Sequence, residues 1–198
     1  MMEPQGLIFD CDGTLADSMP IHWRAWEQTC NRHGLKFTEE RHYALGGTPS
    51  RIIFEILGKE QGVELDPLAL SQEKEAAYLL LMPEVKPVEP VLAIAREHRS
   101  KLPMAVATGG QRGCITQLLE HLGIADWFDA LVTSDDIENP KPAPDTFLLA
   151  AKQIGIAPEN CRAFEDTDLG MQAIRAAGME AVDVRKIPGV LPGQEEEA

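Results

Sequence analysis

The stretch Gly6-Leu7-Ile8-Phe9-Asp10-Cys11-Asp12-Gly13-Thr14-Leu15 decides the fold of this 198-residue chain. Its first four residues are apolar without alternation, which is typical of a strand buried on both faces of a sheet. Asp10 and Asp12 follow at once, and residues two apart in extended backbone point the same way. Ligands bind beyond the carboxyl ends of parallel strands, so we expect both carboxylates to face one site. A turn with two solvated aspartates also explains these residues, so this stretch needs support from elsewhere.

Apolar runs of the same kind recur downstream, and helical patterns separate them. The runs cover 104–107, 130–133, 162–164 and 181–184. The helical patterns end at glycines, which commonly cap helices; one of them places Phe147, Leu148, Ala151 and Ile154 on one face. Strands that alternate with helices predict an α/β fold, a Rossmann-like parallel sheet with helices on both faces.

One segment breaks the alternation. From about Met19 to Met82 the sequence shows helical signals and no convincing strand, with Thr48-Pro49-Ser50 and Asp66-Pro67 as predicted helix starts. The simplest interpretation is a small all-helical cap inserted after the first strand. We therefore predict a core domain of residues 1–17 and 88–198, and a cap domain of residues 18–87.

The composition excludes several classes of protein. The net charge of −14 argues against a nucleic-acid-binding surface, which needs a basic stripe. No apolar run is long enough to span a membrane, and the N-terminus lacks the pattern of a secretory signal, so we expect a cytoplasmic protein without a membrane partner. The four cysteines are far apart in the sequence, which predicts buried or half-buried free thiols rather than disulfides or a zinc site.

Polar residues also follow three later strands. Thr108-Gly109-Gly110 offers a hydroxyl and flexible N–H donors for phosphate oxygens, although an ordinary loop explains this segment equally well. Lys141 lies in Asn139-Pro140-Lys141-Pro142-Ala143-Pro144, where the prolines favour a fixed geometry. Glu165 and Asp166 supply oxygen ligands suited to Mg²⁺. Their alternative role is helix capping, which we assign to Asp168 instead.

Together, four strand ends supply a nucleophilic carboxylate, a hydroxyl, a lysine and an acidic pair. Such a constellation favours phosphoryl transfer, where catalysis consists mainly of positioning and charge neutralisation. A bound divalent cation would also reconcile the acidic chain with an anionic substrate.

These motifs resemble the haloacid dehalogenase (HAD) superfamily. The resemblance rests on DxDGTLxDS at 10–18, on Thr108, on Lys141 and on FEDTDLGMQAIRAAGM at 164–179, in that order along the chain. The helical insertion resembles the subclass with a small α-helical cap. The segments DSMPIHWRAW at 17–26 and KPAPDTFLLAA at 141–151 are similar to the β-phosphoglucomutase-like branch, and within it to bacterial fructose-1-phosphate and 6-phosphogluconate phosphatases.

The resemblance implies a role for each matching residue of the core. Asp10 would be the nucleophile that forms an aspartyl-phosphate, and Asp12 would protonate the leaving group and then activate water. Thr108 and Lys141 would hold the transferring phosphoryl group. Mg²⁺ would be held by four residues: Asp10, Asp12 (through its backbone carbonyl), Glu165 and Asp166.

The resemblance also points to substrate-binding residues. Gly109 beside Thr108 would contribute to the phosphate loop. Arg51 and Lys74 of the cap would contact the distal part of the substrate, and His22 would orient Asp12. Surface charge, or a half-buried histidine, is an equal alternative for these three cap residues. The expected partner is a small sugar phosphate, and we expect a monomer or weak homodimer.

Several functions are compatible with these residues. The leading prediction is a Mg²⁺-dependent sugar-phosphate phosphatase, and the first rival is a β-phosphoglucomutase. Gln111-Arg112 stands where the mutase has a lysine-asparagine pair, which weakens that rival. A dehalogenase is disfavoured because it needs no acid/base carboxylate at Asp12, and a phosphonatase because Lys74 lies in no motif for Schiff-base formation. A non-catalytic binding module is disfavoured because all the acidic and basic motif residues are present.

Overall fold

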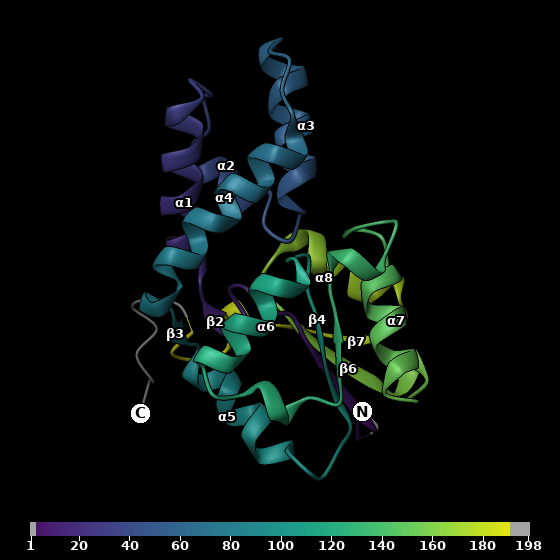
Figure 1. Ribbon diagram of the computed structural model, residues 1–198. Coiled ribbons are helices and arrows are strands. Elements are labelled where there is room, and N and C mark those ends of the chain that lie inside the picture. The colour runs from purple at the N-terminus through teal and green to yellow at the C-terminus, as the bar shows by residue number, and fades with distance from the viewer. Residues whose placement is uncertain (1–2, 191–198) are drawn as a thin grey trace.

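A five-stranded parallel sheet forms the centre of the protein (Figure 1). The structure is a computed structural model that describes residues 3–190. The strand order is β5-β4-β1-β6-β7, and every neighbouring pair is parallel. The predicted α/β class is therefore confirmed. The strands are β1 (Gly6–Phe9), β4 (Met104–Ala107), β5 (Ala130–Val132), β6 (Cys161–Glu165) and β7 (Glu180–Asp183).

Helices cover both faces of this sheet, and the alternation of side chains along β1 shows how. Leu7 and Phe9 pack in the same hydrophobic cluster as α5 (Glu89–His98) and α6 (Arg112–His121). Ile8 points the other way, into the cluster formed with α7 (Asp145–Gln153) and α8 (Asp168–Ala176). All four residues of β1 are buried, so the central strand carries no polar face. This explains why its sequence shows no alternation.

Four helices between β1 and the rest of the sheet extend away from its carboxyl edge (Figure 1). A separate hydrophobic cluster around Trp26, Phe54 and Leu57 holds α1, α3 and α4 together. The helices are α1 (Met19–Arg32), α2 (Glu39–Ala44), α3 (Ser50–Gln61) and α4 (Pro67–Leu81). They are the helical insertion that the sequence predicts.

The chain enters and leaves this helical segment through a two-stranded antiparallel ribbon that the sequence did not reveal. It is formed by β2 (Ala16–Asp17) and β3 (Lys86–Pro87). Tyr78 and Met82, at the end of the segment, pack in the same cluster as Leu15 and Val88 of the core. The division at residues 18 and 87 stays a prediction, because the apolar packing is continuous across it.

The predicted helix starts have mixed outcomes. Asp66 caps α4, since its carboxylate accepts from the N–H groups of Leu68 and Ala69. The helix start predicted at Thr48-Pro49-Ser50 is confirmed, because α3 begins at Ser50 with Pro49 as its N-cap residue, although no side chain caps it. The prediction that Asp168 caps α8 is wrong.

The residue that caps α8 is Thr167, which has extended backbone and a hydroxyl that accepts from the N–H of Gly170 at 3.0 Å. Asp168 is already helical and pairs with Arg185. Leu148, which we placed on the buried face of its helix, is 39% exposed, whereas Phe147 and Ala151 are buried.

Other features agree with the composition. All four cysteines are free and buried, as predicted. Among residues 3–190, no helix has the length and apolarity needed to cross a bilayer. Single-turn 3₁₀ helices complete the described chain: η1 (Met82–Glu84), η2 (Ala125–Trp127), η3 (Ser134–Asp136), η4 (Pro158–Asn160) and η5 (Val184–Lys186).

Candidate active site

The carboxyl edge of the sheet gathers the predicted core residues. Asp10 follows β1, Thr108 follows β4, and Glu165 is the last residue of β6. Lys141 reaches them from the loop before α7. These four residues are at most 3% exposed, although three of them carry charge. Buried charges persist only when they are paired, so the pairing defines the site.

Lys141 is the cation at the centre of this pairing. Its Nζ donates to Oδ1 of Asp10 at 2.6 Å and to Oε2 of Glu165 at 2.7 Å, and it lies 4.9 Å from the ring centre of Phe147. Burial lowers the pKa of Lys141, but the two carboxylates outweigh burial and raise it above the ordinary value. Lys141 is therefore a fixed positive charge beside Asp10.

Asp10, Glu165 and Asp166 form a crowded carboxylate cluster. One oxygen of each lies within 4.8 Å of the others. Burial and the charge of Glu165 raise the pKa of Asp10 well above its usual range, and the same two causes raise that of Asp166. One lysine does not neutralise three carboxylates, and hard oxygen donors this close suit a divalent cation. The residues present therefore fit a Mg²⁺ site.

Close backbone contacts hold the two acidic residues at the end of β6, Glu165 and Asp166, in place. Gly13 has a φ of +87°, and a Cβ at this position would lie 2.2 Å from Oδ2 of Asp166. Thr14 donates its hydroxyl to Oδ1 of Asp166 at 2.9 Å. A Cβ on Gly170 would lie 2.0 Å from the carboxyl group of Glu165. Close approach thus requires glycine at both positions, and the positive φ of Gly13 favours glycine there as well.

The side chain of Asp12 belongs to a different group, which faces the helical segment. Ser18 Oγ donates to Oδ1 of Asp12 at 2.6 Å, and Nε2 of His22 contacts the same oxygen at 3.0 Å. Burial raises the pKa of Asp12, but pairing with His22, the Ser18 hydrogen bond and the charge of Lys74 outweigh it and bring the pKa to about 2. Asp12 is therefore an anion in the resting site.

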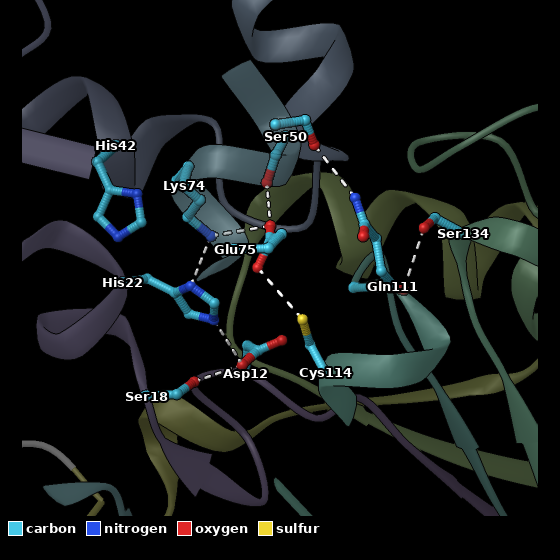
Figure 2. A network of polar contacts seen from close by, with 12 residues as sticks. Asp12, Ser18, His22, His42, Ser50, Lys74, Glu75, Gln111, Cys114 and Ser134 are labelled. Carbon is cyan, nitrogen blue, oxygen red and sulfur yellow. Dashed lines mark hydrogen bonds and ion pairs between the residues drawn. The ribbon is translucent and has the colours of Figure 1, made fainter. Parts of the chain in front are cut away.

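A chain of polar contacts continues from Asp12 into α4 (Figure 2). Nζ of Lys74 lies 2.8 Å from Nδ1 of His22 and 3.1 Å from Oε1 of Glu75. An ammonium group can only donate, so Nδ1 accepts and the ring proton of His22 is on Nε2, where it donates to Asp12. The ring of His22 also stacks on Tyr78, with centres 3.8 Å apart.

The helical segment closes over the site through the Gly46-Gly47 loop. A Cβ on Gly109 would lie 2.3 Å from the carbonyl oxygen of Gly47, so the loop rests directly on the Thr108-Gly109 turn. The cavity measures about 70 Å³ and is lined by Asp10, Asp12 and Thr108 from the core and by His22, Lys74 and Glu75 from the helices.

The structure brings together most of the predicted residues but not all. Asp10, Asp12, Thr108, Gly109, His22 and Lys74 line the cavity, while Lys141, Glu165 and Asp166 lie beside Asp10. Arg51 does not join them. Its side chain is 57% exposed and pairs with Glu55 one turn along α3, so the surface-charge alternative describes it.

Sequence reasoning missed several residues of the site. Ser18 and Thr14 lie inside the quoted motif, where hydroxyls next to carboxylates were the available signal. The Gly46-Gly47 pair was visible as a flexible turn, but its contact with Gly109 joins segments far apart in the sequence. Glu75, Tyr78 and Cys114 gave no local signal, because only tertiary packing brings them to the cavity.

Comparison with known proteins assigns the chain to a family. The family model described as haloacid dehalogenase-like hydrolase matches residues 7–184. The chain belongs to the haloacid dehalogenase-like hydrolase family. This confirms the predicted superfamily and, with it, the prediction of a hydrolase that acts on phosphomonoesters.

Individual relatives show which members of the family the chain is similar to. The chain is 44% identical over 181 residues to the fructose-1-phosphate phosphatase YqaB of Escherichia coli K12, covering 91% of this chain and 96% of the relative. It is 30% identical to a phosphorylated carbohydrates phosphatase of Thermotoga maritima, covering 90% and 83% of the two chains. A crystal structure of β-phosphoglucomutase from Clostridium difficile superposes with a TM-score of 0.82 at 25% identity, covering 92% and 84%.

Proposed function

We propose that this protein is a Mg²⁺-dependent sugar-phosphate phosphatase, of the fructose 1-phosphate or 6-phosphogluconate type, that works through an aspartyl-phosphate on Asp10. The observation that carries the proposal is the position of Asp10. Its carboxylate is buried against Lys141, beside Glu165 and Asp166, and faces the same cavity as Asp12. The similarity to named sugar-phosphate phosphatases supports the choice of substrate class.

In the first half-reaction, a carboxylate oxygen of Asp10 attacks phosphorus and the bond to the sugar oxygen breaks. Asp12 donates a proton to that oxygen. Because Asp12 is ionised at rest, it must first take up a proton, and an approaching phosphate dianion raises its pKa in that direction. Lys141 and the Thr108 hydroxyl offset the negative charge that develops on the phosphoryl oxygens.

In the second half-reaction, Asp12 is again a carboxylate and accepts a proton from water, which attacks the phosphorus of the acylphosphate. Phosphate leaves and Asp10 is regenerated. His22 and Ser18 both hold Oδ1 of Asp12, so Oδ2 is left to exchange the proton with substrate and water. The pairing with His22 favours the ionised form that this step needs.

The metal in this proposal would be held by the side chains of Asp10, Glu165 and Asp166. The backbone carbonyl of Asp12 would be the further ligand that the family resemblance implies. When bound, Mg²⁺ supplies positive charge next to the transferring phosphoryl group and neutralises the carboxylate cluster. The same proposal assigns residues 1–17 and 88–198 to the catalytic core and 18–87 to a cap that closes on the substrate.

The rival function is a β-phosphoglucomutase, and two observations favour considering it. One is the structural likeness to that enzyme, and the other is the small cavity lined by the Gly46-Gly47 loop. A mutase returns the phosphoryl group to a sugar, whereas a phosphatase admits water. Conversion of β-glucose 1-phosphate to glucose 6-phosphate without release of phosphate would establish the mutase.

The proposal is tested by measuring phosphate release from fructose 1-phosphate, 6-phosphogluconate and other sugar phosphates, with Mg²⁺ or with EDTA. We expect turnover with Mg²⁺ and its loss in EDTA. Absence of turnover of every small phosphomonoester, with and without Mg²⁺, would refute the proposal.

A further inference from the structure

Glu75 is a buried carboxylate in the cavity wall that the proposed chemistry does not use. It lies on α4, is 8% exposed, and sits across the cavity from Asp12 (Figure 2). Its Oε1 accepts from Ser50 at 2.6 Å and from Lys74 at 3.1 Å. Burying a charge is costly unless the charge is paired and hydrogen-bonded.

The basic groups of the cavity wall leave no unbalanced positive charge for a distal anion. Among the described residues that line the cavity, the basic ones are His22, His42 and Lys74. His22 is paired through Nε2 with the carboxylate of Asp12 at 3.0 Å, and burial lowers the pKa of His42 to about 4, which keeps His42 neutral. The charge of Lys74 is balanced by Glu75.

The second oxygen of Glu75 has room for a better donor. Oε2 accepts only the thiol of Cys114 among the hydrogen bonds of the described residues, at a distance of 3.6 Å. A thiol is a weak donor. A sugar hydroxyl that reaches Oε2 would make a charge-assisted hydrogen bond in its place, which is shorter and stronger. A phosphate or carboxylate reaching the same place would meet a like charge in a poorly solvated site.

Arg51 is the other cap cation that the sequence suggested for binding a distal anion, but it does not supply positive charge to the cavity. It is exposed, pairs with Glu55, and is not among the residues that line the cavity. On the cap side of the cavity, Glu75 therefore has one oxygen that can accept a further hydrogen bond, and the charge of Lys74 is balanced by Glu75.

We propose that Glu75 is a specificity-determining residue: it selects sugar monophosphates whose distal part is uncharged and carries hydroxyls, and it excludes a carboxylate or second phosphate there. This inference rests on the proposed phosphatase function and narrows its substrate class. It favours fructose 1-phosphate over 6-phosphogluconate. Removing the charge of Glu75 would release Lys74 to attract an anion, so the preference has a single electrostatic origin.

The test compares two substrates that differ only at the far end. Glucitol 6-phosphate carries a hydroxymethyl group where 6-phosphogluconate carries a carboxylate. Steady-state kcat/KM is measured for both with the wild-type enzyme and with Glu75→Gln, which keeps the size of the side chain and an oxygen to accept from Ser50. Glu55→Gln is the matched control, because it removes one acidic charge from the exposed face of α3.

We expect the wild-type enzyme to prefer glucitol 6-phosphate at least roughly tenfold, and Glu75→Gln to shift the ratio toward 6-phosphogluconate by about tenfold. Glu55→Gln should leave the ratio unchanged. Glu75→Thr is shorter and also uncharged, and it should shift the ratio in the same direction. It replaces Glu75→Gln in the test if circular dichroism shows that Glu75→Gln does not fold.

Two outcomes overturn the inference in distinguishable ways. An active wild-type enzyme that prefers 6-phosphogluconate, or whose ratio changes less than about twofold in the folded Glu75 variants, refutes the role of Glu75 and leaves the phosphatase function standing. A wild-type enzyme that releases phosphate from neither substrate nor from any other sugar phosphate refutes the phosphatase function, and the inference with it.

Discussion

Replacing Lys141 by methionine tests how the site is held together in the absence of metal. The Lys141 ammonium donates to Asp10 at 2.6 Å and to Glu165 at 2.7 Å, and all three side chains are almost fully buried. Methionine fills similar space but leaves Asp10, Glu165 and Asp166 without their cation. We expect Lys141→Met to be strongly destabilised in EDTA.

The magnitude follows from the geometry. At an effective dielectric constant of 20, each contact is worth about 6 kcal/mol of gross Coulomb energy, most of which is offset by desolvation. Breaking a buried pair by removing one partner costs about 3–5 kcal/mol. Asp10 and Asp166 can reduce this cost by taking up protons, since their pKa values are already raised. We therefore expect a loss of about 3 kcal/mol in the free energy of unfolding at pH 7.5.

The assay is urea unfolding with EDTA and with saturating Mg²⁺. A ligand at a hundred times its Kd stabilises the folded state by about 2.7 kcal/mol. Mg²⁺ should stabilise Lys141→Met by more than it stabilises the wild type, because no lysine then competes for the carboxylates. Phosphate release should still fall by at least about a hundredfold, because the transition-state charge is no longer offset by Lys141.

Lys152→Met, on the exposed side of α7, is the control for loss of one positive charge. It should unfold as the wild type does under both conditions. A Lys141→Met protein within about 1 kcal/mol of the wild type in EDTA, or one that Mg²⁺ stabilises no more than the wild type, would refute this electrostatic account.

Three further predictions concern residues other than Lys141. Gly13→Ala should lower both Mg²⁺ affinity and stability, because the added Cβ would collide with Asp166. The control is Gly62→Ala, which has a φ of +64° and nothing within 4 Å, and which should cost only about 1–2 kcal/mol of backbone strain. Measuring Tm at increasing Mg²⁺ concentrations distinguishes the two variants. His42 has a folded pKa of about 4 against the ordinary 6.5, so its contribution to stability is complete above pH 6.5 and is lost as pH falls toward 4, by up to about 3 kcal/mol. Urea unfolding at several pH values should show a shallower acid decline in His42→Gln, and equal declines would contradict the assignment. Arg51→Ala should leave kcat/KM within about twofold of the wild type, because the side chain lies outside the cavity; a tenfold loss in phosphate release would show that Arg51 reaches the substrate.

The sequence predicted the part of the fold that depends on local pattern. The unbroken apolar run of β1 indicated a strand covered on both faces, and the helices on both sides of the sheet bear this out. Residues that follow strands, such as Asp10 and Thr108, were predictable as neighbours because parallel strands end at one edge. Lys141 was found through its proline-rich loop.

The remaining features depend on contacts between distant segments. The cavity wall is made by α4 folding back on α1, so Lys74 meets His22 across 52 residues of sequence. Nothing in the sequence around Glu75 distinguishes it from a surface glutamate on a helix. Conversely, Arg51 had the right charge and position in the sequence, but its helix turns it toward solvent. The cap of α8 was misassigned by one residue because Thr167 and Asp168 are both good capping residues.

The central claim is that the phosphoryl group passes through Asp10, and trapping the phosphoenzyme tests it most directly. Wild type, Asp12→Asn and Asp10→Asn are mixed with Mg²⁺ and acetyl phosphate, whose leaving group needs no proton. They are then quenched in acid, digested and examined by mass spectrometry. The account predicts a phosphoryl group on the peptide that contains Asp10, accumulating in Asp12→Asn and absent from Asp10→Asn. A phosphoryl group on another residue, or near-full release of phosphate from a sugar phosphate by Asp10→Asn, would contradict it.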